Sequence, residues 1–410
     1  MTASQHRCRF CDAPLRHTFV DLGLSPLANL NLQAGEEASE KTYPLIARVC
    51  ESCFLVQIDD AVPPEDIFSD YDYFSSYSQG WIEHAKRYCE AMRDQLKLGP
   101  HSFVVEVASN DGYLLKHFVE MGVPVLGVEP AANVAEVAEA AGVPTEVAFF
   151  GVETARRIAA RGRKADLMAA NNVLAHVPTT KDFVGGFAEL LASEGVATFE
   201  FPHLLNLIEK VQFDTIYHEH FFCLSLVAVE KIMASVGLRV FDVEELPTHG
   251  GSLRLFVCHK SASHQETPRL VELRQREKAH HLDTIEGYTG FAAKVEAVKR
   301  SFMSFVEQAR REGKVIAAYG AAAKGVTFLN YCGIGYPTIA AVYDRNPAKQ
   351  NKLTPGTHIP ILSPDDIGAL KPDYVVILPW NIAGEVRHSM AGISAWGGRF
   401  VTAVPEIRIF

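Results

Sequence analysis

Short apolar segments alternate with amphipathic segments over residues 103–201, and this alternation is the feature that most constrains how the chain can fold. Runs typical of buried strands occur at residues 103–107, 125–128, 147–150, 165–170 and 196–201. Helical periodicity separates several of them, at residues 113–121, 133–141 and 181–191. Strands joined by crossover helices pair in parallel, so the pattern predicts an α/β sheet that binds ligands at the carboxyl ends of its strands.

The same reasoning extends on both sides of this unit. A helix is predicted at 81–98 before the first strand, and another at 226–236 precedes two strands at 239–246 and 253–258. The short loop between those two strands contains Gly250 and Gly251 and favours a terminal hairpin. After a charged, helix-prone stretch at 266–312, strand patterns at 314–319, 339–343, 374–378 and 399–404 predict a second parallel sheet.

Two C-x-x-C pairs lie within the first 70 residues, where little helical periodicity is found and a small, loop-rich module is expected. Four thiolates from two tight turns satisfy tetrahedral zinc and leave no open position for catalysis, which predicts a structural zinc site. Its ligands would be Cys8, Cys11, Cys50 and Cys53. The other four cysteines lie in apolar patterns and are expected to pack in cores.

Charge and composition exclude several classes of protein. The net charge of -10 and the lack of clustered Lys and Arg argue against broad affinity for nucleic acid. No apolar run approaches the roughly 20 residues that span a bilayer, and no apolar leader segment is present, so a cytoplasmic location is expected. A monomer is expected as well.

The turn after the first strand of the alternating unit has the form of a nucleotide-binding loop. Glu106 ends the strand, and Ala108, Asn110, Asp111 and Gly112 lead into the next helix. A strand, a tight turn and a helix N-terminus form the usual cradle for an adenosine-bearing ligand. A dinucleotide fold would carry G-x-G-x-x-G here, and only one glycine is present, which disfavours NAD.

Polar residues also follow the next strands of this unit. Glu129 and Pro130 end the second strand, about 20 residues downstream, where a carboxylate accepts both ribose hydroxyls in such folds. Asn171 and Asn172 follow a later strand and are expected at the same edge of the sheet. Any one of these side chains alone could be a solvated loop residue.

The segment 217–222 concentrates side chains that move protons near neutral pH, since Tyr217, His218, Glu219 and His220 are consecutive. A surface turn would more often carry Gly, Asn or Ser. If the segment is helical, Tyr217 and His220 share a face while Glu219 points elsewhere.

An acidic first turn without dinucleotide glycines, followed by a terminal hairpin, resembles class I S-adenosylmethionine-dependent methyltransferases, although Ala108 and Ser109 replace their usual glycine-rich turn. Together with both cysteine pairs, Y-H-E-H-F-F, T-H-G-G-S-L-R and Y-G-A-A-A-K, the whole chain resembles the zinc-containing sugar C-methyltransferases of deoxysugar biosynthesis. The resemblance implies S-adenosylmethionine as cofactor and methylation of carbon 3 of a 4-keto-deoxysugar linked to dTDP or GDP. The alternatives are an NAD-dependent sugar oxidoreductase and a non-catalytic zinc-finger interaction protein.

In that family a base removes the proton from carbon 3, next to the keto group, and the resulting enolate attacks the methyl group. Such chemistry requires a base and hydrogen-bond donors for the developing oxyanion. We expect His220 to act as the base and Tyr217 to polarise the keto oxygen, while Glu219 orients the base or competes with it. His218 is expected to face solvent. By resemblance alone, Tyr73 and His176 match active-site positions, although a lone His or Tyr is usually structural.

The loop 318–324 follows a strand and opens a helix, so its N–H groups and Lys324 could hold a diphosphate, or its small residues could serve close packing. The resemblance implies that this domain helps to bind the sugar nucleotide. The candidate substrate-binding residues are Ser76, His249, Tyr319, Gly320, Lys324, Asn330 and Lys349. The alternative for His249 is a cap on the tight hairpin, and the alternative for Asn330 and Lys349 is turn formation. The expected division is a zinc module at 1–70, a methyltransferase domain with linker helices at 71–288 and a Rossmann-like domain at 289–410.

Overall fold

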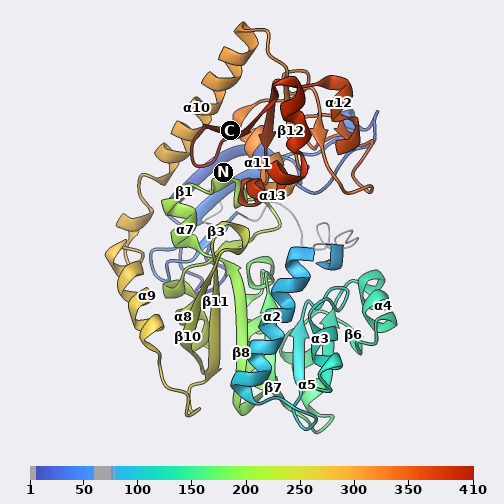
Figure 1. Cartoon of the computed structure of the whole chain (residues 1–410). Coiled ribbons are helices and arrows are strands. Elements are labelled where there is room, and N and C mark those ends of the chain that lie inside the picture. The colour runs from blue at the N-terminus through green and yellow to red at the C-terminus, as the bar shows by residue number, and fades with distance from the viewer. Residues whose placement is uncertain (1–5, 60–74, 78) are drawn as a thin grey trace.

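The computed structural model describes residues 6–59, 75–77 and 79–410, and these residues form three sheets (Figure 1). The first sheet is antiparallel and has the strand order β1-β2-β3-β9. Its strands are β1 (His17–Ser25), β2 (Tyr43–Val49), β3 (Val56–Ile58) and β9 (Phe222–Cys223). The prediction of a loop-rich module was therefore incomplete. The missed signal is the period of two in β2, which buries Leu45, Ala47 and Val49 on one face.

The central sheet has the order β10-β11-β8-β7-β4-β5-β6, with five parallel strands and the antiparallel pair β10 and β11 at one edge. The parallel strands are β4 (Val104–Val107), β5 (Val125–Glu129), β6 (Thr145–Val147), β7 (Ala165–Asn171) and β8 (Leu191–Pro202). The predicted hairpin is confirmed as β10 (Leu238–Leu246) and β11 (Ser252–His259). The strand expected at 147–150 lies earlier, because the chain leaves the sheet after Val147 and exposes Phe149.

The helices that flank the central sheet are α2 (Gln79–Leu96), α3 (Leu115–Glu120), α4 (Ala132–Ala140), α5 (Val152–Ala159), α6 (Thr180–Leu190), α7 (Leu204–Glu209) and α8 (Leu226–Ala234). Helix α8 begins where Ser225 Oγ accepts the Ala228 N–H. The four cysteines outside the C-x-x-C pairs are buried, as the apolar patterns predicted.

Two helices connect the central sheet to the C-terminal domain along one side of the molecule, namely α9 (Pro268–Ala279) and α10 (Phe291–Arg311) (Figure 1). Thr267 caps α9 by accepting the Leu270 N–H, and Pro268 occupies its first turn. Helix α10 buries a stripe that includes Val295, Phe302 and Val306, which explains why this charged segment is helical.

The C-terminal sheet has the order β14-β13-β12-β15-β16-β17, and only β17 is antiparallel. Its strands are β12 (Ile316–Tyr319), β13 (Val342–Tyr343), β14 (Ile361–Leu362), β15 (Tyr374–Ile377), β16 (Arg399–Thr402) and β17 (Arg408–Ile409). The helices of this domain are α11 (Ala323–Cys332), α12 (Ile367–Leu370) and α13 (Ala383–Ser389). The predicted second parallel sheet is confirmed.

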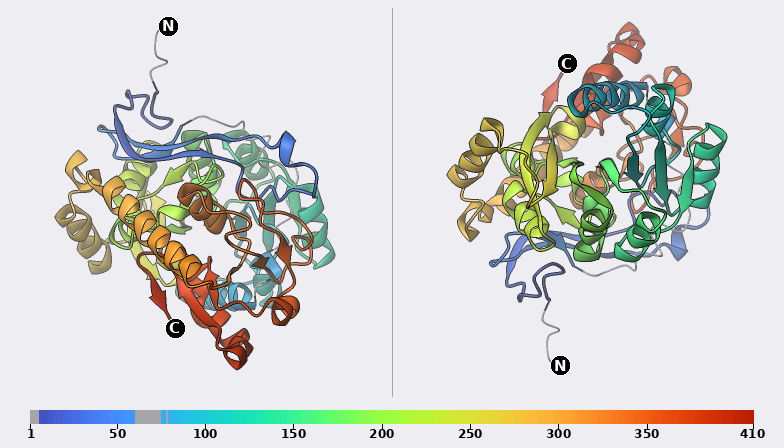
Figure 2. Two further views of the ribbon diagram at one scale, coloured as in Figure 1. Left: turned by 90° about the horizontal axis from the view of Figure 1, so that it is seen from above. Right: turned by 90° about the horizontal axis from the view of Figure 1, so that it is seen from below.

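The N-terminal strands run along one flank of the molecule and touch both other parts (Figure 2). Strand β1 packs on α10 and α11, and Leu32 forms an antiparallel bridge with Leu353. Short 3-10 helices lie at Glu37–Ser39, Ser75–Tyr77, Leu174–His176, Phe213–Thr215, Thr248–Gly250, Ile285–Tyr288, Pro364–Asp366, Trp380–Ile382 and Ala391–Trp396. Among the described residues, none of the helices combines the length and apolar character that crossing a bilayer requires.

Candidate active site

The four cysteines of the two C-x-x-C pairs come together as predicted. Their sulfur atoms all lie within 4.8 Å of one another, with Cys8 and Cys53 Sγ at 3.5 Å and Cys11 and Cys50 Sγ at 3.5 Å. Tetrahedral zinc with bonds of about 2.3 Å would place sulfur atoms about 3.8 Å apart, so the four thiols fit this metal.

The two cysteine turns are built alike, which explains why distant pairs present matching ligands. In each turn the N–H after the second cysteine, of Asp12 or Phe54, donates to the carbonyl of the first cysteine at 2.9 Å. Gln57 Nε2 lies 3.2 Å from Cys8 Sγ and supports it from outside the ligand set.

The loop after β4 forms a tight cradle without the usual glycines. Ala108, Asn110 and Gly112 all have positive φ, at 56°, 49° and 76°. A Cβ on Gly112 would lie 3.0 Å from Val143 Cγ2, so only glycine fits this close approach without displacing its neighbour. At the other two positions, Ala108 and Asn110 adopt the left-handed conformation that glycine usually supplies in such loops.

Glu129, at the end of β5, fixes this loop. Its two carboxylate oxygens accept the N–H groups of Asn110 at 2.9 Å and Ala131 at 3.0 Å. Pro130 lies between the carboxylate and the start of α4. Each carboxylate oxygen has further acceptor capacity, so Glu129 retains the ability to accept a ribose hydroxyl.

Glu106 and Asp111 add two buried acids to the same place. Burial raises the pKa of Glu106 well above its usual value, and the Tyr113 hydroxyl partly opposes this. Asp111 Oδ2 accepts the Ser76 N–H at 3.0 Å, whereas its buried Oδ1 has no hydrogen-bond partner within the described residues. Asn110 Oδ1 accepts the Ser75 N–H, so the segment containing Ser76 is tied to the cradle. Tyr73 lies outside the described residues.

Asn171 and Asn172, at the end of β7, reach the same edge of the sheet. Asn172 has a φ of 54°, and its N–H donates to Glu200 O at 2.7 Å. Its Nδ2 lies 3.3 Å from His249 Nε2, which joins the predicted cofactor and substrate residues. The buried Asn172 Oδ1 has no partner in the described part of the chain. The edge thus offers acceptors suited to a polar cofactor.

The segment 217–222 is a turn before β9, not a helix, yet Tyr217 and His220 do meet. The Tyr217 hydroxyl lies 2.8 Å from His220 Nε2, and His220 Nδ1 donates to the Thr215 carbonyl at 2.7 Å. Because a carbonyl only accepts, Nδ1 carries the proton of the neutral ring and Nε2 remains the basic atom. The His176 ring centroid lies 4.7 Å from that of His220.

Both histidines are held neutral at ordinary pH. Loss of hydration lowers the pKa of His176 to about 4. Loss of hydration is the main cause that lowers the pKa of His220 well below its usual value, and the neighbouring His176 and Lys324 lower it further. Nε2 of His220 is therefore unprotonated at neutral pH, and the same burial makes it a weaker base than a hydrated imidazole.

Glu219 is buried beside them, and its Oε1 accepts the Asn29 Nδ2–H at 3.0 Å. Burial raises the pKa of Glu219. The expectation that His218 faces solvent was wrong, because its side chain is 1% exposed. Its Nε2 donates to the Pro44 carbonyl at 3.2 Å, since the pairing of β9 with β3 turns this side chain toward the N-terminal strands.

The C-terminal domain contributes Lys324 from the first turn of α11. Lys324 Nζ donates to Asn381 Oδ1 at 2.7 Å and lies 4.8 Å from the centroid of the Trp380 ring. Burial lowers the pKa of Lys324, and Asp214 opposes this. Gly320 has a φ of +90°, and a Cβ there would lie 2.5 Å from Pro379 Cδ. The loop therefore packs tightly, and its cation faces the central domain.

Trp380 and Asp214 join the two domains beside Lys324. Trp380 Nε1 donates to Asp214 Oδ2 at 2.7 Å. Burial raises the pKa of Asp214 to about 6, although Lys324 and the Trp380 N–H oppose this. The acid therefore binds its proton more tightly in the folded than in the unfolded chain, so stability falls as pH rises through this range.

We expect Asp214→Asn to abolish this loss of stability. The shift from 3.8 to about 6 corresponds to about 3 kcal/mol. When the pH is raised from 4 to 7, the unfolding free energy of the parent should therefore fall by about 3 kcal/mol relative to that of the variant. Unfolding free energies from denaturant titrations at both pH values measure it, with the exposed Asp365→Asn as control. An equal difference at both pH values would contradict the burial argument.

The remaining predicted substrate residues are engaged within the C-terminal domain. Asn330 Nδ2 donates to the carbonyls of Val326 and Pro355, and Lys349 Nζ donates to the Ala321 carbonyl at 2.6 Å. Tyr319 is buried in the core of this domain. A separate cavity of about 620 Å³ includes Arg345, Asp365 and Trp396 in its lining, and none of the predicted substrate residues lines it.

Sequence reasoning missed Asn29, Thr215, Asp214 and Trp380. Each lies outside the motifs, and no local pattern distinguishes an asparagine or aspartate that meets a partner more than 100 residues away. For Thr215 the contact is made by its carbonyl, which any residue would supply.

Three families match consecutive parts of the chain. Residues 8–68 match a putative zinc binding domain, residues 81–243 a methyltransferase domain and residues 247–405 a C-methyltransferase C-terminal domain. The C-methyltransferase NovU of Streptomyces niveus is 34% identical over 403 residues, which cover 98% of this chain and 96% of NovU.

Solved structures of methyltransferases are similar to part of the chain. Magnesium protoporphyrin IX methyltransferase of Synechocystis PCC 6803 with bound SAH is 15% identical, with a TM-score of 0.34, over 44% of this chain and 83% of that chain. A SAM-dependent methyltransferase of Anabaena variabilis ATCC 29413 is also 15% identical, with a TM-score of 0.33, over 42% and 83% of the two chains.

Proposed function

The chain belongs to the C-methyltransferases that carry a zinc-binding N-terminal domain, and from this premise we propose that it methylates carbon 3 of a 4-keto-deoxysugar nucleotide. It is an S-adenosylmethionine-dependent enzyme with a zinc site formed by four cysteines. The observation that carries the proposal is the pairing of Tyr217 with His220, whose Nε2 is unprotonated and whose Nδ1 is fixed by a carbonyl.

A sugar carbon becomes a nucleophile only after it loses a proton. In the proposed reaction His220 Nε2 removes the proton from carbon 3, and the C–H electrons move into the enolate. The Tyr217 O–H, which donates to Nε2 before the reaction, turns to the keto oxygen at carbon 4, where negative charge develops. S-adenosylmethionine supplies the electrophilic methyl group when it is bound.

In this scheme Glu219 either orients His220 or replaces it as the general base. Its raised pKa brings it nearer to the range of a useful base, and Asn29 fixes one of its oxygens. His176 packs against His220 and is proposed as a further catalytic residue from the resemblance. Tyr73 is proposed as a further catalytic residue from the resemblance of its motif.

The cofactor and substrate residues are proposed from their places at the sheet edges. The proposed S-adenosylmethionine contacts are Glu106, Ala108, Asn110, Asp111, Gly112, Glu129, Pro130, Asn171 and Asn172. The proposed sugar-nucleotide contacts are Ser76, His249, Tyr319, Gly320, Lys324, Asn330 and Lys349. Among these, Lys324 has the strongest support, because a buried cation at a helix N-terminus suits a diphosphate.

The proposal is tested by incubating the enzyme with S-adenosylmethionine and a panel of dTDP- and GDP-linked 4-keto-deoxysugars. We expect a mass gain of one methyl group on at least one member, and exchange of the carbon 3 proton with solvent deuterium when the cofactor is left out. Methylation on oxygen or nitrogen, or methylation with no exchange at carbon 3, would count against the enolate mechanism.

A further inference from the structure

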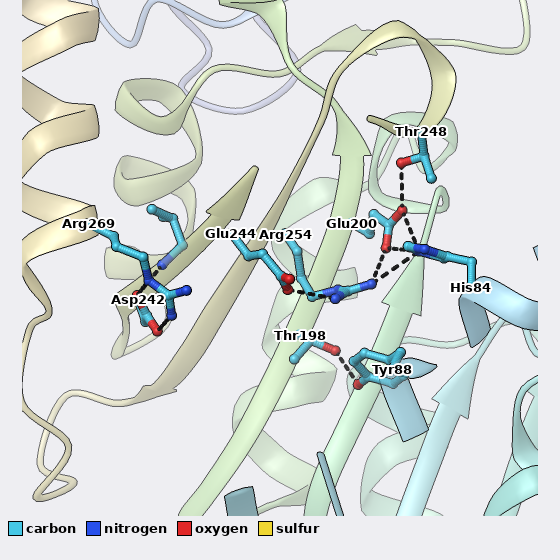
Figure 3. Close-up of polar contacts among 10 residues, drawn as sticks. His84, Tyr88, Thr198, Glu200, Asp242, Glu244, Thr248, Arg254 and Arg269 are labelled. Atoms are coloured by element: carbon cyan, nitrogen blue, oxygen red, sulfur yellow. Dashed lines mark hydrogen bonds and ion pairs between the residues drawn. The ribbon is translucent and has the colours of Figure 1, made fainter. Parts of the chain in front are cut away.

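A buried carboxylate that no motif contains lies next to the candidate site. Glu200, near the end of β8, is fully buried and accepts hydrogen bonds from three side chains on three different elements (Figure 3). His84 Nε2 of α2 lies 3.1 and 3.0 Å from its two oxygens. Arg254 Nη2 of β11 donates at 2.7 Å, and Thr248 Oγ1 donates at 3.1 Å.

The charge of this carboxylate is maintained despite burial. Burial alone would raise the pKa of Glu200, but the hydrogen bond from His84 and the charge of Arg254 lower it below its usual value. Arg254 stands directly opposite Glu200 in the pairing of β11 with β8, and it also binds Glu244. Glu200 is therefore an ionised and fixed anchor for whatever donates to it.

One of those donors begins the turn that carries His249. Thr248 precedes His249, which has a φ of 52°, and the two following glycines have φ values of 92° and 128°. Left-handed backbone at a histidine is unfavourable and persists only where surrounding contacts impose it. The Thr248 hydroxyl on Glu200 and the Gln212 Nε2 on the Gly250 carbonyl, at 2.9 Å, are such contacts.

The second donor connects the same carboxylate to helix α2. The His84 ring stacks on Trp81 with centroids 4.9 Å apart, and the Trp81 ring meets His249 edge to face at 5.6 Å. The backbone of Glu200 also accepts the Asn172 N–H, and Asn172 Nδ2 contacts His249. His249 is thus reached from the Glu200 side chain by two routes, and by a third from its backbone carbonyl, which any residue would supply.

We propose that Glu200 is a positioning residue of the methyl-transfer site, whose carboxylate acts through Thr248 and His84 to fix His249 toward the acceptor. This inference rests on the proposed function, in which His249 contacts the sugar nucleotide. Asn172, which follows β7, and Trp81 of α2 contact His249, and the charged or titratable groups that act on it electrostatically are His84 of α2, Glu200 of β8, Lys324 of α11 and His220.

The chain offers a matched pair of variants for the test. Thr248→Val removes the hydroxyl that binds Glu200. Thr198→Val removes a buried hydroxyl two residues before Glu200 on the same strand, which binds Tyr88 at 2.6 Å and does not touch the turn (Figure 3). In the full enzyme Thr248→Val should lower kcat at least tenfold. Thr248→Ser should restore it to within about twofold, and Thr198→Val should leave it near the parent value.

A readout without substrate separates this inference from the proposed function. We expect the imidazole resonances of His249, assigned by difference with His249→Gln, to shift or broaden in Thr248→Val and to keep their positions in Thr198→Val. Equal loss of kcat in both valine variants, or an unchanged His249 signal in Thr248→Val, would overturn the inference. Should the parent enzyme methylate no keto-sugar nucleotide, the proposed function fails and the His249 signal still decides the positioning role.

Discussion

Replacement of His220 by asparagine is expected to lower the rate of methyl transfer by about 10²-fold to 10⁴-fold, the contribution that a positioned general base usually makes. The affinity for S-adenosylmethionine should change by less than about twofold, because none of the proposed cofactor contacts touches this ring. Asparagine can still donate to the Thr215 carbonyl, so the turn should keep its shape.

The measurement is single-turnover methyl transfer together with calorimetric titration of S-adenosylmethionine. His218→Asn serves as the control. It makes the same substitution two residues away from His220, at a histidine that faces the N-terminal strands. Tyr217→Phe should also reduce the rate strongly, since it removes the proposed donor to the keto oxygen. Near-normal turnover in His220→Asn would mean that another group abstracts the proton, and Glu219 would be the first candidate.

Simultaneous replacement of Cys8 and Cys50 by serine is expected to remove the bound zinc and to unfold the N-terminal sheet. Structural zinc sites bind with about 10–16 kcal/mol of apparent free energy, which exceeds the stability of most small domains. The purified parent should contain one zinc per chain, and the double variant less than a tenth of that.

Loss of the metal should also disturb the structure around the active site. Strand β9, which directly follows the segment with Tyr217 and His220, completes the N-terminal sheet by pairing with β3, and Asn29 of the module contacts Glu219. Metal analysis and hydrogen exchange over residues 6–59 and 213–223 measure both effects. The control is Cys89→Ala combined with Cys258→Ala, two buried cysteines outside the cluster. A parent protein without zinc would refute the assignment of the metal site.

Much of the fold could be predicted because periodicity is a local property. The strands β4, β5, β7 and β8 and the hairpin β10–β11 follow from apolar runs and glycine turns, whereas only the structure gives their order in the sheet. In the N-terminal sheet the regular period of two in β2 was overlooked, and β1 is harder to recognise because it pairs with β2 through two register shifts.

The candidate site was predicted in part. Residue types predicted the cluster of four cysteines, and the strand-end rule placed Glu129 and Asn172 at one edge of the sheet. The contact between Tyr217 and His220 was expected for a helix, and the structure makes it in a turn. The side of the turn on which His218 lies could not be read from spacing, because the segment is not helical and the partner strand decides its direction.

The sequence by itself determined the two parallel sheets, the cysteine cluster and the chemical groups that end the strands. These depend on residue type and on spacing over a few positions. The tertiary structure alone decided that Asn29 meets Glu219 across 190 positions, that Trp380 of the C-terminal domain binds Asp214, and that Glu200 holds the turn before His249. Such contacts depend on how whole sheets pack, because a hydrogen bond forms only where packing brings donor and acceptor within about 3 Å.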